Sequence, residues 1–154
     1  MDFKIDETDK KILNIIKNNA RTPYNDIGKK CKVSGATIQL RIQKLTDAGI
    51  ISGSQFNINP VGLGYYTCAF IGIQINLTST STHEEVYKKI TLIPEIVECQ
   101  HISGKYSLII KIYTRNNEHL KKLIIEKIQS IPEIVSTETF IALEEGFNRQ
   151  LPVE

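Results

Sequence analysis

The sequence from Val33 to Leu45 reads Val-Ser-Gly-Ala-Thr-Ile-Gln-Leu-Arg-Ile-Gln-Lys-Leu, and it predicts a helix that begins after Ser34. A serine is a good N-cap because its hydroxyl accepts a hydrogen bond from an otherwise unpaired N–H of the first turn. Ile38, Ile42 and Leu45 recur at helical spacing. They form one narrow apolar stripe, which must pack against other elements.

The opposite face of this helix is small at its start, hydrogen-bonding along its length and basic toward its end. A helix that enters the DNA major groove needs slim residues for close approach, polar groups for base edges and cations for phosphates. The candidate DNA-binding residues on this face, its flanks and its cap are Ser34, Ala36, Thr37, Gln39, Leu40, Arg41, Gln43 and Lys44. The alternative is an ordinary amphipathic helix with a solvated polar face, so the neighbouring segments must decide.

Two further helices are expected before this one. Asp6 can cap the first, with Asp9 placing a carboxylate near its positive end. Thr22 and Pro23 form a cap followed by proline at the first position of a second helix, over about 24–31. Two short helices joined by a tight turn predict a helix-turn-helix. Its expected core contains Ile12, Leu13, Ile16, Ile27, Cys31, Val33, Ile38, Ile42 and Leu45.

Length and composition are those of an ordinary globular chain. Its 154 residues suit one domain or two small ones, and 23% of them are charged. The three cysteines are odd in number and widely spaced, which predicts neither a disulfide framework nor a zinc site. The sequence contains no apolar run long enough to span a bilayer and no signal-peptide pattern at its start. We therefore expect no membrane partner and a cytoplasmic location.

The net charge of +2 is unevenly distributed. Up to Gly64 there are ten Lys and Arg against six Asp and Glu, and after it nine against eleven. A basic first part joined to a mildly acidic second part favours a nucleic-acid-binding domain attached to a different one. Lys29, Lys30 and Lys32 are candidates for phosphate contact, although an ordinary solvated surface explains them equally well.

A boundary is expected where Gly62, Leu63 and Gly64 interrupt the pattern. This gives a DNA-binding domain with a linker over 1–63 and a second domain over 64–154. The linker, from about Ile50 to Pro60, is extended and could pair as a strand with a partner chain.

The second domain contains an internal repeat. Residues 93–97 and 131–135 both read Ile-Pro-Glu-Ile-Val, and each copy follows a helical pattern and precedes a strand-like one. Two such βαβ units in tandem predict an α+β, ferredoxin-like βαββαβ fold. Both helices then cover one face of a four-stranded sheet. Because the other face is also apolar, we expect it to be buried in a homodimer.

These features together resemble the Lrp/AsnC family of feast/famine transcription regulators, over about residues 5 to 145. The resemblance depends on Ile5-Asp6-x-x-Asp9-x-x-Ile12-Leu13, Asn19-Ala20-Arg21-Thr22, the helix from Ser34 to Leu45, Ala48-Gly49-Ile50-Ile51 and Leu63-Gly64. The chain is most similar to the asparagine-responsive AsnC branch. That similarity lies in Asn19–Thr22, Phe70–Ile73, Ser103–Ser107, Glu126–Ile131 and Ser136–Thr139.

The resemblance implies a winged or plain helix-turn-helix, a dimerising ferredoxin-like domain, and octamers that bind a small amino acid between dimers. It places the effector site on a turn and on strand residues of a neighbouring chain: Gly104, Lys105, Tyr106, Ser107, Thr137, Glu138 and Thr139. Many family members carry an acidic residue where this chain has Ser107. Its absence favours a neutral effector such as asparagine. From the residues alone, Gly104 is better explained as a hairpin glycine and the threonines as exposed strand formers.

No catalytic or cofactor site is predicted. Cys99 and His101 alternate onto one strand face, but no third metal ligand lies nearby in sequence. The pairs Glu84-Glu85 and Glu144-Glu145 have no accompanying nucleophile, which argues against an enzyme.

Three functions therefore remain to be compared. The first is a sequence-specific transcription regulator that senses a small amino acid. Its expected partners are double-stranded DNA and other copies of the chain. The second is an architectural protein that compacts DNA with little sequence preference. The third is an amino-acid-sensing regulatory subunit that does not bind DNA, since ferredoxin-like domains serve many functions.

Overall fold

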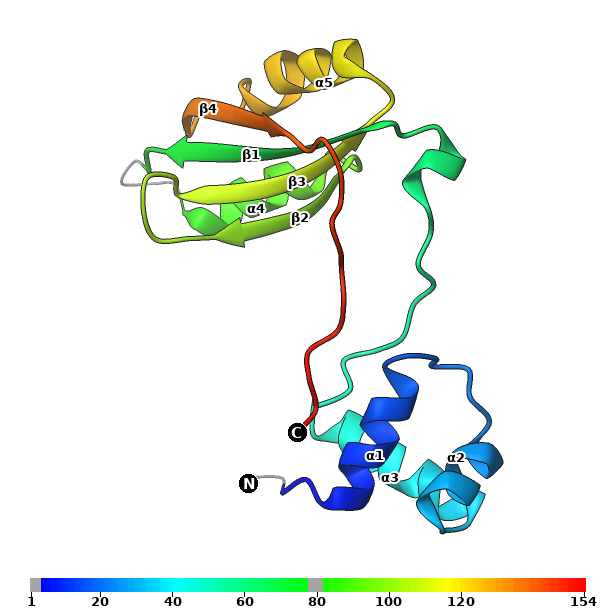
Figure 1. Cartoon of the computed structure of the whole chain (residues 1–154). Helices are drawn as coiled ribbons and strands as arrows, with labels where there is room; N and C mark the ends of the chain where they lie inside the picture. The colour runs from blue at the N-terminus through cyan, green and yellow to red at the C-terminus, as the bar shows by residue number, and fades with distance from the viewer. Residues whose placement is uncertain (1–3, 78–81) are drawn as a thin grey trace. The chain divides into compact units, whose positions relative to one another are not determined.

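The computed structural model describes residues 4–77 and 82–154, and divides them into two compact units (Figure 1). The first unit contains the described residues up to Asn57 together with Phe147–Glu154, and the second runs from Ile58 to Gly146. This division differs from the expected one at 63/64. A short 3-10 helix, Pro60–Leu63, belongs to the second unit. Its Pro60 carbonyl accepts a hydrogen bond from the Tyr65 N–H.

The C-terminal residues belong with the first unit, although the sequence assigns them to the second domain. One contact within the first unit explains their position. The Asn14 side-chain amide donates to the Val153 carbonyl at 3.1 Å, a pairing across 139 positions of sequence. Local patterns carry no signal for so distant a contact.

The first unit is the predicted three-helix arrangement. Helix α1 covers Glu7–Ile16, α2 covers Tyr24–Cys31 and α3 covers Gly35–Asp47. Asp6 and Asp9 form a reciprocal capping box at the start of α1, and the Ser34 hydroxyl accepts from the Thr37 N–H at 3.1 Å. The helix α2 differs in one detail from the prediction. Pro23 is the N-cap itself rather than the first helical residue.

The core of the first unit forms where the three helices meet. Ile12, Ile27 and Ile38 are fully buried at its centre. The partly buried apolar residues around them are Ile15, Ile16, Cys31, Val33 and Ile42. The sequence predicted this cluster with three differences. Ile15 packs against it, Leu13 does not, and Leu45 is fully buried but is not one of its members.

The turn between α2 and α3 is tight because a glycine lets their backbones approach. A Cβ atom on Gly28 would lie 2.6 Å from the Val33 carbonyl oxygen and 3.2 Å from the Ser34 carbonyl carbon. Lys32 ends α2 in the left-handed conformation, at φ 58°. Together these features allow only three residues to separate the end of α2 from the start of α3.

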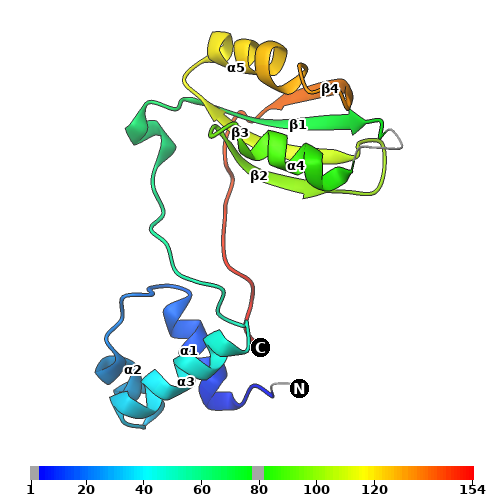
Figure 2. The ribbon, with the colours of Figure 1, turned by 180° about the vertical axis from the view of Figure 1, so that it is seen from behind.

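The second unit is a four-stranded antiparallel sheet in the order β2-β3-β1-β4. Its elements are β1 (Thr67–Ile75), α4 (His83–Thr91), β2 (Ile96–His101), β3 (Leu108–Thr114), α5 (Asn117–Leu123) and β4 (Ile134–Ile141). The chain continues from α5 into a π-helical turn, Ile124–Ile128. Both helices cover one face of the sheet, as the views from front and back show (Figures 1 and 2). The expected ferredoxin-like fold is therefore confirmed.

The two copies of the Ile-Pro-Glu-Ile-Val repeat make the same turn. In each, the N–H of the second isoleucine donates to the carbonyl of the first at 3.0 Å. Each glutamate then reaches the helix of the other half, because Glu133 binds Lys89 of α4 and Glu95 lies 3.7 Å from His119 of α5. The repeat therefore joins the two halves of the sheet unit.

The core lies between the sheet and the two helices, and it takes alternate residues of the central strands. Its buried members are Ala69, Ile71, Ile73, Val86, Ile90, Ile93, Leu108, Ile110, Ile112, Leu120, Leu123, Ile128 and Ile131. The intervening residues face the other side of the sheet. In register there are Cys68 with Tyr113, Phe70 with Phe140, and Gly72 with Ile109.

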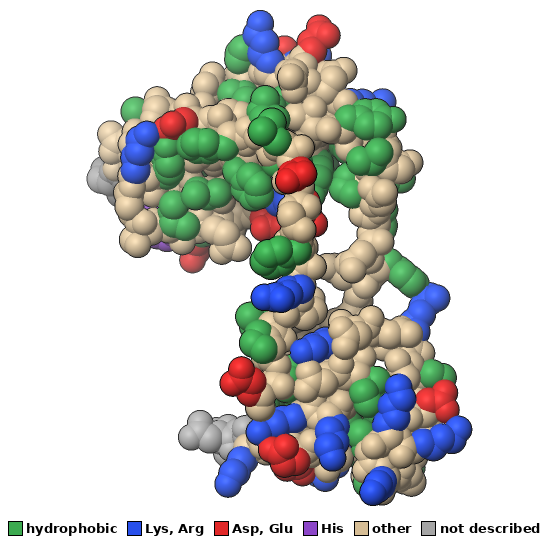
Figure 3. Space-filling model, viewed as in Figure 1, with side chains coloured by type: hydrophobic (Ala, Val, Ile, Leu, Met, Phe, Trp, Pro, Cys, Tyr) green, Lys and Arg blue, Asp and Glu red, His purple; other side chains and the backbone are tan. Residues whose placement is uncertain are grey.

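This second side, the open face of the sheet, is rich in hydrophobic side chains. Phe70 is 39% exposed and Phe140 48% exposed. Figure 3 shows hydrophobic side chains gathered over the sheet on the face turned away from α4. Isolated exposed apolar residues are normal, but a contiguous group marks an interaction surface.

Two further expectations concern the linker and membranes. In the described chain no strand lies between α3 and β1, so pairing of the linker with a partner chain stays a prediction. None of the described helices is long and apolar enough to cross a membrane.

Candidate functional site

The outward face of α3 carries most of the candidate DNA-binding residues. Ala36, Gln39, Leu40, Gln43 and Lys44 are exposed, while Ile38 and Leu45 on the inward face are fully buried. The cap and the first turn are held together, because the Ser34 and Thr37 hydroxyls share a hydrogen bond at 2.8 Å. The helix therefore presents a fixed polar surface to solvent.

Arg41 does not point along this surface. Its Nη1 donates to Asp6 at 2.7 Å and to Asp9 at 2.8 Å, and both aspartates belong to the capping box of α1. The Asp9 side chain is only 7% exposed, so this carboxylate is sheltered from solvent, whereas Asp6 is 52% exposed. Arg41, expected from its flank position to contact DNA, joins α3 to the start of α1 in this structure.

The ion pair shifts the titration of its partners. The backbone N–H of Asp9, and next the Arg41 guanidinium, hold the pKa of Asp6 below its usual value of 3.8. Hydrogen bonds to Asp6 and then to Asp9 raise the pKa of Arg41. The charged forms of Asp6 and Arg41 are therefore favoured in the folded protein.

At pH 7 the Asp6→Asn variant is expected to be less stable than wild type, and the difference should shrink as the pH falls below about 4. Asparagine caps a helix as well as aspartate does, so the change removes the charge that pairs with Arg41 and keeps the cap. Because the folded-state pKa lies below 3.8, the ion pair stabilises the fold above that pH and is lost as the pH falls through the folded value.

Thermal melts across pH check this expectation. The matched control is Glu7→Gln, which removes an 81% exposed carboxylate from the same turn without touching Arg41. A stability difference for Asp6→Asn that stays constant down to acid pH would contradict the ion-pair account.

Around Arg41 lies a hollow of about 410 Å³. Its lining residues are Asp6, Asp9, Thr37, Leu40, Arg41 and Lys44. Asp6 and Asp9 are not residues that the sequence assigned to this surface, since their capping pattern explained them already. Among the described side chains Lys44 makes no ion pair, and Lys30 and Lys32 at the end of α2 make none either. These lysines are free to meet an anionic partner.

The turn between β2 and β3 carries the first group of expected effector residues. Gly104 has φ 131°, a conformation that favours glycine. Lys105 lies 2.5 Å from Glu138, and the Tyr106 hydroxyl also donates to Glu138. Three of the predicted residues, from the turn and from β4, are thus brought together within one chain on the open face.

Contacts within this group shift the pKa values of Lys105 and Glu138. The Glu138 carboxylate, and next the Tyr106 hydroxyl, raise the pKa of Lys105 above its usual value. In return, hydrogen bonds from Lys105 and then Tyr106 lower the pKa of Glu138. A cation and an anion therefore stand side by side at the surface, which suits the two charges of an amino-acid zwitterion.

The Tyr106 ring lies flat against β1 at Gly72. A Cβ atom on Gly72 would approach the ring atoms to 2.7 Å, so no larger residue fits without moving the tyrosine. Gly72 is also the register partner of Glu138. This role of Gly72 was not predicted from the sequence, although alternation along β1 places it on the open face.

Ser107 and the two threonines lie apart from this group. The Ser107 hydroxyl accepts from the Ile75 N–H at 3.3 Å, and its own N–H donates to the Ile73 carbonyl at 2.9 Å. Thr137 and Thr139 are register partners of Ile73 and Ile71, which face the helices. Within one chain the seven predicted residues therefore divide between the two sides of the sheet.

Two polar residues extend the group on the open face and were not predicted. Gln74 donates from its side-chain amide to the Lys105 carbonyl at 2.9 Å, and the Ser136 hydroxyl donates to the Gln74 side-chain oxygen at 2.7 Å. Strand alternation is the signal that could have found both, since Gln74 follows Gly72 and Ser136 precedes Glu138 by two residues.

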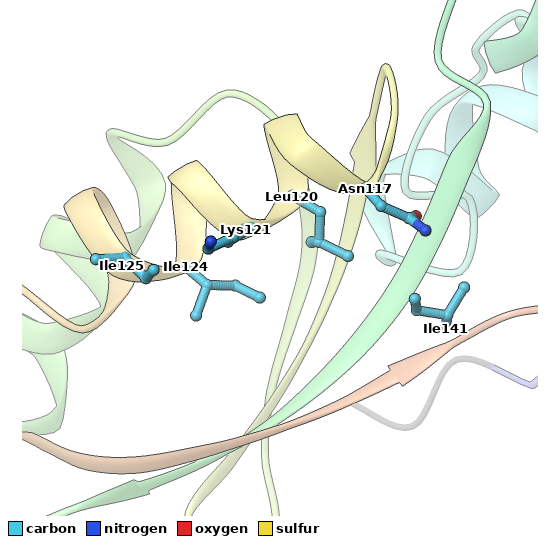
Figure 4. A pocket seen from close by; sticks show the side chains of 6 residues that line it. All are labelled: Asn117, Leu120, Lys121, Ile124, Ile125 and Ile141. Carbon is cyan, nitrogen blue, oxygen red and sulfur yellow. The ribbon is translucent and has the colours of Figure 1, made fainter.

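A second hollow, of about 320 Å³, lies between α5 and β4 (Figure 4). The residues that line it are Asn117, Leu120, Lys121, Ile124, Ile125 and Ile141. Apart from one amide and one ammonium group, these are apolar. None of the residues predicted to bind DNA or an effector lines this hollow.

The other candidate chemistry has structural explanations. In the described parts of the chain, no cluster of three or more His, Cys, Asp or Glu could hold a metal ion. Cys99 packs against the core, and burial raises its pKa. Glu85 completes a capping box with Thr82 at the start of α4.

Comparison with known proteins matches both units. Residues 68–151 fit the family model described as the Lrp/AsnC ligand binding domain, and residues 5–52 fit the winged helix-turn-helix DNA-binding model. The chain is 40% identical over 147 residues to the regulatory protein AsnC of Haemophilus influenzae, which covers 96% of this chain and 97% of that relative. It is 38% identical over 149 residues to the regulatory protein AsnC of Escherichia coli K12, covering 97% of each. The solved structure of E. coli AsnC has a TM-score of 0.89 with this chain at 36% identity, covering 97% of this chain and 99% of that one.

Proposed function

The chain belongs to the Lrp/AsnC family of DNA-binding transcription regulators, and from this premise we propose that it binds specific DNA sequences in response to asparagine. Family membership also confirms the expectation that the chain is not an enzyme. The observation that carries the proposal is the pair of surfaces described above. One unit presents an exposed polar and basic helix, and the other presents the paired charges of Lys105 and Glu138 beside the Tyr106 hydroxyl. In this proposal the protein acts in the cytoplasm, where its DNA partner lies.

In the proposed DNA complex, α3 lies in the major groove. Ala36 allows close approach, Gln39 and Gln43 face base edges, and Lys44 meets phosphate. Arg41 acts as a positioning residue, because its hydrogen bonds to Asp6 and Asp9 hold α3 against α1. Ser34 and Thr37 contribute by fixing the first turn.

The proposed effector site uses the group on the open face. Lys105 faces the α-carboxylate of the amino acid and Glu138 its α-ammonium group, so the effector replaces the ion pair between them. Ser107, with Thr137 and Thr139 of a neighbouring chain, offers neutral hydrogen bonds to a side-chain amide. The identity of 40% to a regulatory protein AsnC supports this choice of effector over a charged one.

The proposed assembly is a homodimer through the open face of the sheet, with dimers forming an octamer. The exposed Phe70 and Phe140 support burial of this face against a second copy. In a two-fold dimer the two α3 helices would reach half-sites about 34 Å apart, one turn of DNA.

The proposal is tested by comparing DNA affinities. A duplex selected from a random pool by the full-length protein is titrated beside a scrambled duplex, over a range of salt concentrations. A specific regulator binds the selected duplex about 10³-fold or more tightly at physiological salt. Equal affinity for both would instead favour the architectural function, and no binding to either would favour the regulatory subunit.

The Lys44→Ala variant is expected to weaken binding to selected and scrambled DNA alike, and to reduce the slope of log affinity against log salt by about 1. Lys44 makes no ion pair in the described structure, so its removal leaves the fold intact. The same titration of Arg41→Ala provides the contrast. That variant should lower the melting temperature and leave the salt slope unchanged. A reduced slope for Arg41→Ala would show that Arg41 contacts phosphate.

A further inference from the structure

Leu40 is exceptional among the large apolar residues of α3. Its side chain is 66% exposed, whereas Ile38 and Leu45 of the same helix are fully buried. Burying a leucine stabilises a fold, and the exposed Leu40 makes little such contribution. It lies on the outward face three residues after Thr37 and four before Lys44. An exposed leucine needs no special explanation by itself, so its surroundings decide its meaning.

The polar groups around Leu40 are already engaged. The Thr37 hydroxyl shares its hydrogen bond with Ser34, and Arg41 is held by Asp6 and Asp9. Thr37, Arg41, Asp6 and Asp9 line the hollow of about 410 Å³ together with Leu40 and Lys44. Next to Leu40, the hollow therefore offers an apolar surface rather than free hydrogen-bonding groups. The cation of Lys44 lies at its end.

The DNA major groove contains one apolar group on its base edges, the C5-methyl of thymine. We infer that Leu40 reads this methyl group, so that each half-site contains a thymine at the position facing Leu40. The inference rests on the proposed function, in which α3 enters the major groove. It adds to that function the identity of the base that the hollow recognises and of the chemical group on that base.

The expected effect follows from burial of a single methyl group. One buried methyl group contributes about 0.8 kcal/mol. Its removal therefore weakens binding about fourfold when one half-site is changed, and about fifteenfold when both half-sites of a dimer are changed. Replacing thymine by uracil removes the methyl and leaves every hydrogen-bonding group in place.

The experiment uses full-length protein and a duplex selected from a random pool, with asparagine present and absent. Each thymine is replaced in turn by deoxyuridine, and the affinity is measured for wild type and for Leu40→Ala. Wild type should lose affinity at one thymine of each half-site, and Leu40→Ala should bind the thymine and uracil forms of that position equally. Because Leu40 is exposed, the melting temperature of the Leu40→Ala variant should equal that of wild type.

Lys44→Ala is the matched control on the same face. It should lose affinity for both duplexes and keep the wild-type ratio between thymine and uracil. Equal binding of wild type to all uracil forms would overturn the inference and leave the proposed function standing, as would a Leu40→Ala variant that still discriminates. If no sequence is enriched from the pool, sequence-specific binding fails and the inference fails with it.

Discussion

Replacing Gly28 with alanine is expected to destabilise the first unit by about 1–3 kcal/mol and to weaken DNA binding by about tenfold or more. The added Cβ would lie 2.6 Å from the Val33 carbonyl oxygen, 3.2 Å from the Ser34 carbonyl carbon and 3.3 Å from the Gly35 nitrogen. All three are backbone atoms, which cannot rotate away as a side chain can. The turn must open, and the start of α3 moves with it. The better helix propensity of alanine offsets about 1 kcal/mol of this at most.

Chemical denaturation and DNA titration of the full-length protein check this result. Gly62→Ala is the matched control, because a Cβ there has no neighbour within 4 Å and the backbone is not left-handed. A Gly28→Ala variant with the stability and DNA affinity of the Gly62→Ala control would contradict the tight turn.

Replacing Gly72 with alanine is expected to abolish the response to the amino acid while DNA binding is retained. The added Cβ would meet the Tyr106 ring at 2.7 Å, so the ring must turn away from β1. Its hydroxyl then leaves Glu138, and the group that includes Lys105 loses its arrangement. Overpacking of this kind costs about 1–3 kcal/mol of stability as well.

Calorimetric titration with asparagine measures the effect, and light scattering follows the assembly state. Gly146→Ala is the control within the same unit, since a Cβ there meets nothing within 4 Å. Tyr106→Phe separates the two causes, because it keeps the ring against Gly72 and removes only the hydroxyl. Unchanged asparagine binding by Gly72→Ala would exclude the open-face group as the effector site.

Much of the fold was predictable because its determinants are local. The Ser34 cap and the stripe of Ile38 and Leu45 lie within one helix, and the helix begins and packs as they predict. The Ile-Pro-Glu-Ile-Val repeat predicts the βαββαβ order because each copy makes the same turn between a helix and a strand. Periodicity, caps and turns are properties of short segments, and a sequence displays them directly.

The arrangement of the candidate sites was less predictable because it depends on distant pairings. Arg41 and Asp6 are separated by 35 positions, and only the packing of α3 on α1 brings them together. Alternation alone puts Glu138 and Thr137 on opposite faces, but the pairing of Glu138 with Gly72 comes from the register of β4 on β1. The contact between Tyr106 and Gly72 likewise requires the sheet to be assembled.

The most direct test of the account is the affinity of the full-length protein for its selected duplex, measured in the presence of each of the twenty amino acids in turn. Coupling between an effector site and a DNA site typically changes affinity by about 5–150-fold. The account predicts a change of this size with asparagine and none with the other nineteen. An affinity that no amino acid alters, or that responds to another amino acid and not to asparagine, would contradict it.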